Sequence, residues 1–124
     1  AVVSPAERAR ATWELVRAEL AEAGIEPKTI IDDDVYTFGA GRLLRVVRAF
    51  PERWQTVALV GHNPAMEELL QTLTGCGLGM PTSAVAVIDL PGEWQRVGDS
   101  PAYLVAHGRP PVESLTAPAG ISAG

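Results

Sequence analysis

The stretch Thr56–Leu70, TVALVGHNPAMEELL, contains the pattern that decides the fold. It opens with Val57–Val60, an unbroken apolar run that favours a strand in a sheet covered by helices on both faces. Gly61 allows a turn at the end of this strand, and Asn63 and Pro64 are predicted to be the N-cap and first residue of a helix. The pattern therefore predicts a strand in the middle of a sheet, then a turn and a helix.

His62 lies between the end of this strand and the helix, which is predicted to continue over Ala65–Thr74. In open α/β sheets, ligands bind at the carboxyl ends of strands, where a helix N-terminus offers free N–H groups and partial positive charge to an anion. A lone histidine at such a corner is usually an inert, hydrogen-bonded residue. The order of strand, Gly-His-Asn-Pro and helix favours a functional histidine instead.

The chain has 124 residues, enough for one domain with one core. Its formal net charge of −5 argues against a nucleic-acid partner, because phosphate backbones attract basic surfaces. No apolar run is long enough to cross a bilayer and no signal peptide opens the sequence, so we expect a cytoplasmic protein without a membrane partner. Cys76 is the only cysteine and the two histidines are far apart. We therefore expect no disulfide, no bound metal and no cofactor.

A first helix is predicted after Ala1–Val3, an apolar opening that is interpreted as the end of a strand. Ser4 is the expected N-cap and Pro5 the first helical residue, and Glu7 stands three residues after Ser4, as a capping box requires. The helix is predicted to end at Gly24. Its face toward the sheet is expected to consist of Ala9, Trp13, Val16 and Leu20.

Arg8 shares a helix face with Thr12, near the N-terminus of this helix. A cation is unexpected there, because the helix dipole favours acidic residues in the first turn. Arg8 is either a solvated surface charge or a ligand that points into the crevice and binds an anion. Spacing alone does not decide between these two interpretations.

The rest of the chain alternates strand and helix patterns. A second strand is expected over Lys28–Asp32, followed by further acidic residues that are interpreted as a solvated strand end. A short helix over Arg42–Phe50 ends before a proline, and a strong strand is expected over Ala84–Leu90. Two antiparallel edge strands are then predicted, at Trp94–Val97 and Ala102–Ala106.

This alternation predicts an α/β fold, a three-layer sandwich with a mostly parallel central sheet and helices on both faces. Residues 1–110 are predicted to form the domain. Residues 111–124 are rich in proline, serine, alanine and glycine, and are expected to form a mobile tail.

Two segments resemble motifs of the histidine phosphatase superfamily, whose fold is that of phosphoglycerate mutase. Ser4–Thr12, SPAERARAT, is similar to its S-x-x-x-R-A-x-x-T segment, and Val60–Pro64, VGHNP, is similar to its second histidine motif. Other segments resemble the small SixA-type branch, the phosphohistidine phosphatases: Val35–Tyr36, Met80–Ala84 and Gly92–Trp94. The resemblance covers nearly all of the chain up to about Pro110.

The resemblance implies a metal-independent phosphatase that works through a phosphohistidine intermediate. In this family a histidine in an R-H-G motif attacks phosphorus, while two arginines and a second histidine surround the phosphoryl group. By match of motif, Arg8 is the second arginine and His62 the second histidine, both catalytic and substrate-binding. Asn63 and Thr82 are expected to add substrate contacts. The implied partners are a phosphorylated protein or small phosphorylated substrate, and inorganic phosphate.

The sequence departs from the family because it contains no R-H-G motif; it begins where the family's second motif begins. The resemblance therefore implies a fragment that lacks the first strand, the nucleophile and the first helix, and that is inactive alone. Because that strand lies in mid-sheet, its absence would expose unpaired backbone groups. We therefore expect a dimer or association with the missing N-terminal segment. His107 precedes a glycine, but its arginine stands on the wrong side for the motif.

Two alternatives to a phosphatase stay open. The domain could bind a phosphorylated group or a protein partner without turnover, or Arg8 could be a surface charge and His62 an inert residue. Larger family members also carry a glutamate as proton donor, which has no match here, and Thr37 stands where an acid would follow the tyrosine. This difference favours a phosphoramidate substrate, because a protonated imidazole leaves without strong acid help.

Overall fold

The computed structural model describes residues 1–81 and 84–108 of the chain. None of the described helices combines the length and apolar character that a membrane span requires. The elements, in chain order, are β1 (Val2–Val3), α1 (Glu7–Glu22), β2 (Ile30–Ile31), the 3-10 helix η1 (Asp33–Val35), α2 (Ala40–Arg48), β3 (Leu59–Val60), α3 (Ala65–Thr74), β4 (Val85–Asp89), the 3-10 helix η2 (Trp94–Arg96) and β5 (Tyr103–Gly108).

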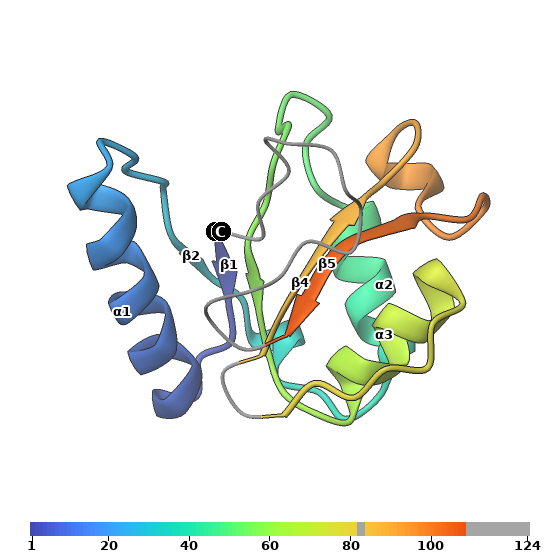
Figure 1. Ribbon diagram of the computed structural model, residues 1–124, viewed down its shortest axis with the longest axis horizontal. Coiled ribbons are helices and arrows are strands. Elements are labelled where there is room, and N and C mark those ends of the chain that lie inside the picture. The colour runs from blue at the N-terminus through green and yellow to red at the C-terminus, as the bar shows by residue number, and fades with distance from the viewer. Residues whose placement is uncertain (82–83, 109–124) are drawn as a thin grey trace.

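β1 is the central strand of a three-stranded parallel sheet with the order β2-β1-β3. Val2 is in register with Ile30 on one side and with Leu59 on the other. β4 and β5 pair with each other in a separate antiparallel sheet (Figure 1). The short apolar opening of the chain thus becomes the strand that connects the other two.

The two residues of β1 contribute to two different cores, because successive side chains of a strand point to opposite faces. Val3 packs with Ala9 and Trp13 of α1. Val2 belongs to a larger core that includes Leu43 of α2 and Leu69 of α3. Helices therefore cover both faces of the sheet, with α1 on one side and α2 and α3 on the other (Figure 1). The predicted α/β sandwich is confirmed.

The prediction that Val57–Val60 lies in mid-sheet is wrong for the described residues. β3 comprises only Leu59–Val60, both half-buried, and pairs with β1 alone. Val2 and Val3 are 2% and 0% exposed, because β1 has a neighbouring strand on each side and helices pack over both of its faces. An apolar strand is fully buried only where both of its neighbours are present, and β3 has one in the described part of the chain.

The predicted capping box at the start of α1 is also wrong. Helix α1 begins at Glu7 with Ala6 as its N-cap, and no side chain caps it. The Ser4 hydroxyl lies two residues further back and accepts a hydrogen bond from the backbone N–H of Ala6 at 3.2 Å. Val16, predicted to face the sheet, is 40% exposed. The end of α1 agrees with prediction, since Gly24 adopts a φ of 80° that favours glycine.

The predicted strand at Trp94–Val97 is a 3-10 turn instead, η2. The Glu52 carboxylate accepts hydrogen bonds from the backbone N–H groups of Trp94, at 3.0 Å, and Gln95, at 3.3 Å. The Trp94 indole also donates to the carbonyl of Trp54 at 2.7 Å. These bonds occupy the donors that a strand ladder would use, and they come from residues some forty positions away.

The other predicted elements are present with shifted ends. β2, α2, β4 and β5 fall on the predicted second strand, short helix, strong strand and last strand. Helix α2 begins at Ala40, two residues before the predicted start at Arg42. The tail predicted over residues 111–124 lies outside the described residues.

Candidate functional site

Ser4 and His62 connect the two motifs on which the functional hypothesis depends. A hydrogen bond of 2.7 Å joins Ser4 Oγ and His62 Nε2, and the tautomer of the imidazole decides which group donates. Ser4 is fully buried, and its backbone N–H donates to the carbonyl of Val60 at 3.0 Å. The segment that leads into α1 is therefore held against the end of β3, directly before the turn that carries His62.

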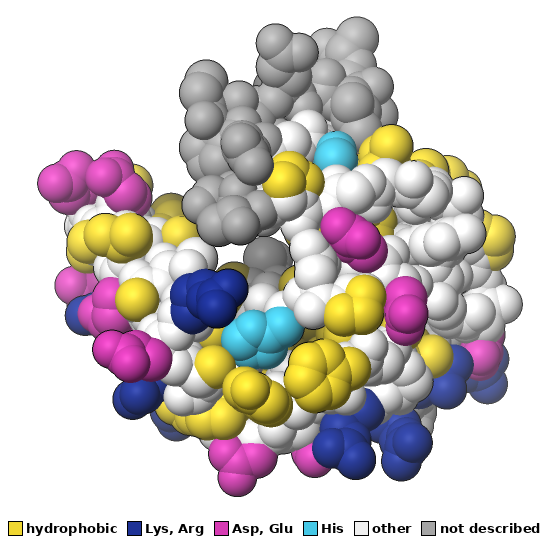
Figure 2. Space-filling view, turned by 90° about the horizontal axis from the view of Figure 1, so that it is seen from below, with side chains coloured by type: hydrophobic (Ala, Val, Ile, Leu, Met, Phe, Trp, Pro, Cys, Tyr) yellow, Lys and Arg dark blue, Asp and Glu magenta, His cyan; other side chains and the backbone are white. Residues whose placement is uncertain are grey.

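The position of Arg8 follows from this arrangement, because Arg8 lies on the first turn of α1, four residues after Ser4. Its side chain is exposed. Both β1 and β3 are parallel and end at the same sheet edge, so Arg8 and His62 belong to the same end of the molecule. A space-filling view from below shows a histidine and a basic side chain on one surface (Figure 2).

Gly61, directly before His62, has no side chain, and the turn that carries His62 has no room for one. A Cβ at this position would lie 3.1 Å from Met66 Sδ and 3.2 Å from Val35 Cγ1. Gly61 is not one of the glycines with a positive φ, so its backbone conformation does not itself require glycine. The turn therefore depends on glycine because the buried Val35 and the half-buried Met66 pack closely against it.

Asn63 does not cap the helix, which corrects the sequence prediction. The N-cap of α3 is Pro64, and no side chain caps this helix. The Asn63 amide nitrogen instead donates to the carbonyl of Met80 and, at 3.2 Å, to Glu67 Oε1. Glu67 Oε1 also accepts from the Met80 backbone N–H at 2.8 Å. Asn63 thus fixes the segment around Met80 against α3, and its substrate contact stays a prediction.

The N-terminus of α3 is less positive than its dipole alone would make it, because Glu67 and Glu68 lie in its first turn. Glu68 Oε2 accepts a hydrogen bond from the Ala40 backbone N–H at 3.2 Å. Two carboxylates near the helix start would repel an anion. The start of α3 is therefore less suited to an anion than the sequence pattern indicates.

Tyr36 is an aromatic neighbour of His62. Its ring centroid lies 5.2 Å from that of His62, with the planes inclined at 59°. Ser4 is a site residue whose role the local sequence pattern does not indicate, because that pattern predicts a helix cap. The serine that opens the S-x-x-x-R spacing was the available signal.

The remaining sequence candidates are Thr82 and His107. Thr82 is outside the described residues. His107 is on β5, where its Nε2 is 2.7 Å from the carbonyl oxygen of Gly79. Within residues 1–81 and 84–108, no group of three or more histidine, cysteine or acidic residues could hold a metal ion.

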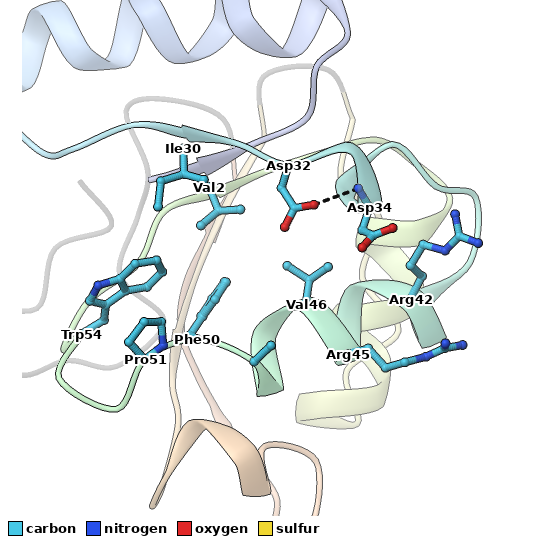
Figure 3. Close-up of a pocket in the computed structure, with 11 residues that line it drawn as sticks. Val2, Ile30, Asp32, Asp34, Arg42, Arg45, Val46, Phe50, Pro51 and Trp54 are labelled. Carbon is cyan, nitrogen blue, oxygen red and sulfur yellow. Dashed lines mark hydrogen bonds between the residues drawn. The ribbon is translucent and has the colours of Figure 1, made fainter.

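A cavity of about 440 Å³ opens between β1, β2 and α2 (Figure 3). Val2, Phe50 and Trp54 line its apolar end, and Asp34, Arg42 and Arg45 line its charged end. Neither Arg8 nor His62 lines it. The candidate site is therefore a different part of the surface.

Comparison with known proteins supports the fold. No family model matches the chain. An uncharacterized protein of Mycobacterium leprae is 28% identical over 100 residues, which are 73% of this chain and 62% of the relative. The chain thus spans less than two thirds of the length of that curated relative.

A solved structure from Nakamurella multipartitia, described provisionally as the phosphohistidine phosphatase SixA, has the same fold. It aligns with a TM-score of 0.64 and 24% identity, over 93% of this chain and 70% of the other. At that identity the likeness establishes the architecture, a helix-covered parallel sheet.

Proposed function

We propose that this chain is the larger part of a SixA-type phosphatase, in which Arg8 and His62 bind the phosphoryl group. The observation that carries the proposal is the Ser4–His62 hydrogen bond of 2.7 Å. It ties the S-P-A-E-R segment to the G-H-N-P turn, which are 58 residues apart in the chain. The two motifs are distant in the sequence, and the fold brings them together at one edge of the sheet.

The chemistry of these side chains fits a phosphoryl group. The guanidinium of Arg8 is a planar fork of donors that matches two phosphate oxygens. A protonated His62 donates a hydrogen bond and offsets the negative charge that develops during transfer. Fixed cations then supply the electrostatic stabilisation, and the reaction needs no metal.

The covalent step belongs to a histidine that this sequence does not contain in an R-H-G motif. In the proposed cycle its ring nitrogen attacks phosphorus and the substrate's leaving group departs with the bonding electrons. Water then attacks the phosphohistidine, which releases inorganic phosphate and regenerates the histidine. We propose a phosphohistidine or other phosphoramidate as substrate, in a cytoplasmic protein, and we expect this chain to be inactive by itself.

The strand that carries the nucleophile is proposed to lie between β3 and β4. In the described residues each of these strands has one partner, β1 for β3 and β5 for β4. All four residues from Val85 to Ile88 are only half-buried, although the segment is apolar, and so are both residues of β3. A strand between them would pair with both edges and cover these side chains.

The decisive experiment uses the protein expressed together with its upstream coding sequence. His62→Ala is expected to lower turnover of a phosphohistidine peptide by at least about 100-fold, because removal of one charge-stabilising donor costs about that much. His107→Ala is the matched control and should leave turnover unchanged. Full activity in His62→Ala would refute the assignment.

The second candidate function is phosphate or partner binding without turnover, which the missing R-H-G motif favours. Reading the coding sequence upstream of Ala1 discriminates between the two. An R-H-G tripeptide there supports catalysis, whereas its absence combined with phosphate binding at Arg8 and His62 supports a binding domain.

A further inference from the structure

Two large aromatic side chains are exposed beside the candidate site. Tyr36 is 52% exposed and Phe38 is 71% exposed. Their ring centroids lie 6.3 Å apart in an edge-to-face arrangement, and the Tyr36 ring lies 5.2 Å from that of His62. Phe38, Tyr36 and His62 therefore form a continuous row of three rings.

The backbone that presents these rings is held by specific contacts. Val35, directly before Tyr36, is fully buried against Gly61. The backbone N–H of Tyr36 donates to the carbonyl of Asp33 at 3.1 Å, and that of Thr37 donates to Val35 at 3.0 Å. The exposure of the rings is thus built into an ordered turn, and exposed apolar groups next to a polar site are typical of binding surfaces.

We propose that Tyr36 and Phe38 form an aromatic wall that contacts a flat ring carried by the substrate on its phosphoryl group. This inference rests on the proposed function. If Arg8 and His62 hold the phosphoryl oxygens, the group bonded to phosphorus must lie over the neighbouring surface, and Tyr36 is in direct contact with His62. The substrate class is then an aryl or imidazolyl phosphate rather than a phosphorylated sugar.

The physical reason is the match between surfaces. A flat ring buries apolar area against Tyr36 and Phe38 and can stack on them or meet them edge to face. A sugar would give up hydrogen bonds to water, and apart from the single hydroxyl of Tyr36 these rings offer its hydroxyl groups no hydrogen-bond partner. The wall would therefore discriminate by the group attached to phosphorus and would have no effect on the phosphoryl group itself.

The experiment compares two probes, phenyl phosphate and inorganic phosphate, with the complete 124-residue chain. Each is titrated at constant pH and ionic strength while the His62 ring signals are followed by NMR, which gives a Kd for each probe. The wild-type chain is expected to bind phenyl phosphate more tightly than phosphate. Phe38→Ala should reduce this preference by about two- to tenfold, the effect of one aromatic contact, and leave the phosphate Kd unchanged.

Two control variants define the interpretation. Phe38→Tyr should keep the preference, because it keeps the ring. Tyr103→Ala removes another exposed aromatic, 69% exposed on β5, and should change neither Kd. The same phenyl preference in wild type and Phe38→Ala would overturn the proposal, as would equal affinities of the wild type for both probes.

A different set of results would show that the proposed function itself is wrong. His62→Ala should abolish the binding of both probes, detected in that variant through the backbone amide signals of the turn. If phosphate binds His62→Ala as well as wild type, the proposed function is wrong, whatever the ring preference. If Phe38→Ala weakens both probes equally, the wall only positions His62 and the substrate-class inference is wrong. Absence of saturable binding of either probe contradicts both proposals.

Discussion

Ser4 is a small residue with three roles in this fold. It is fully buried, its hydroxyl accepts from the Ala6 N–H, and the same oxygen bonds His62. Its sequence neighbours predicted a helix cap, which would have satisfied only local donors. The actual partner is 58 residues away, and no local pattern encodes that distance.

Ser4→Ala is expected to lower the free energy of unfolding by about 1–3 kcal/mol, because it leaves the Ala6 N–H and His62 without their partner. Urea denaturation measures the change, and NMR of the His62 ring should show increased motion. Thr12→Ala is the control: its hydroxyl bonds the Arg8 carbonyl at an exposed position, and the loss should be below about 0.5 kcal/mol. Equal effects of the two variants would contradict the structural role given to Ser4.

Gly61→Ala tests how tightly the turn before His62 is packed. The new methyl group would meet Met66 Sδ at 3.1 Å and Val35 Cγ1 at 3.2 Å. Met66 is flexible, whereas buried Val35 is stiff, so we expect a loss of about 1–3 kcal/mol in stability. Gly39→Ala, where nothing lies within 4 Å, is the matched control. A Gly61→Ala variant as stable as wild type would show that the turn has spare room.

At the scale of elements, η2 shows how a distant side chain overrides a local pattern. Glu52 supplies acceptors to the backbone of Trp94 and Gln95 and turns a predicted strand into a 3-10 turn. Glu52→Ala should destabilise the fold by about 1–2 kcal/mol through loss of charge-assisted bonds. Thermal unfolding checks this. Glu26→Ala, an exposed carboxylate in a loop, should have little effect; an equal loss would argue against the role of Glu52.

The sequence predicted the elements that have a strong internal pattern. The apolar centres of β2 and β4, the helix ended by Gly24 and the α/β class all follow from periodicity and turn residues. What it could not predict depends on contacts far apart in the chain. The central place of β1 follows from its two neighbours, and the Ser4–His62 bond follows from the parallel pairing of β1 with β3.

The candidate site was predictable in its parts and not in its arrangement. Motif resemblance selected Arg8 and His62, and the fold brings their segments to one sheet edge. The helix-cap role predicted for Asn63 is wrong, because its amide donates to Met80 and Glu67 across a loop, whereas its substrate contact stays a prediction. The exposure of Tyr36 and Phe38 could not be predicted from the sequence, because it depends on how Val35 packs against the distant Gly61.

At the scale of the whole molecule, the strand proposed to lie between β3 and β4 leads to a prediction about hydrogen exchange in the full-length protein. If a strand lies between β3 and β4, the amides of these strands should exchange with solvent more slowly in the full-length protein than in the 124-residue chain. Hydrogen-exchange mass spectrometry can follow peptides that cover Leu59–Val60 and Val85–Asp89. Peptides covering Ile30–Ile31 of β2 are the internal control and should not change. Equal exchange of β3 and β4 in both proteins would contradict the inserted strand.

The central claim is that Arg8 and His62 bind one phosphate together. An NMR titration of the chain with inorganic phosphate, following the side-chain nitrogen signals of Arg8, His62 and His107, tests it most directly. The claim predicts saturable shifts of Arg8 and His62 with one common Kd, and no saturable shift of His107, whose ring is engaged with Gly79. Different Kd values for Arg8 and His62, or a saturable shift of only one of them, would contradict it.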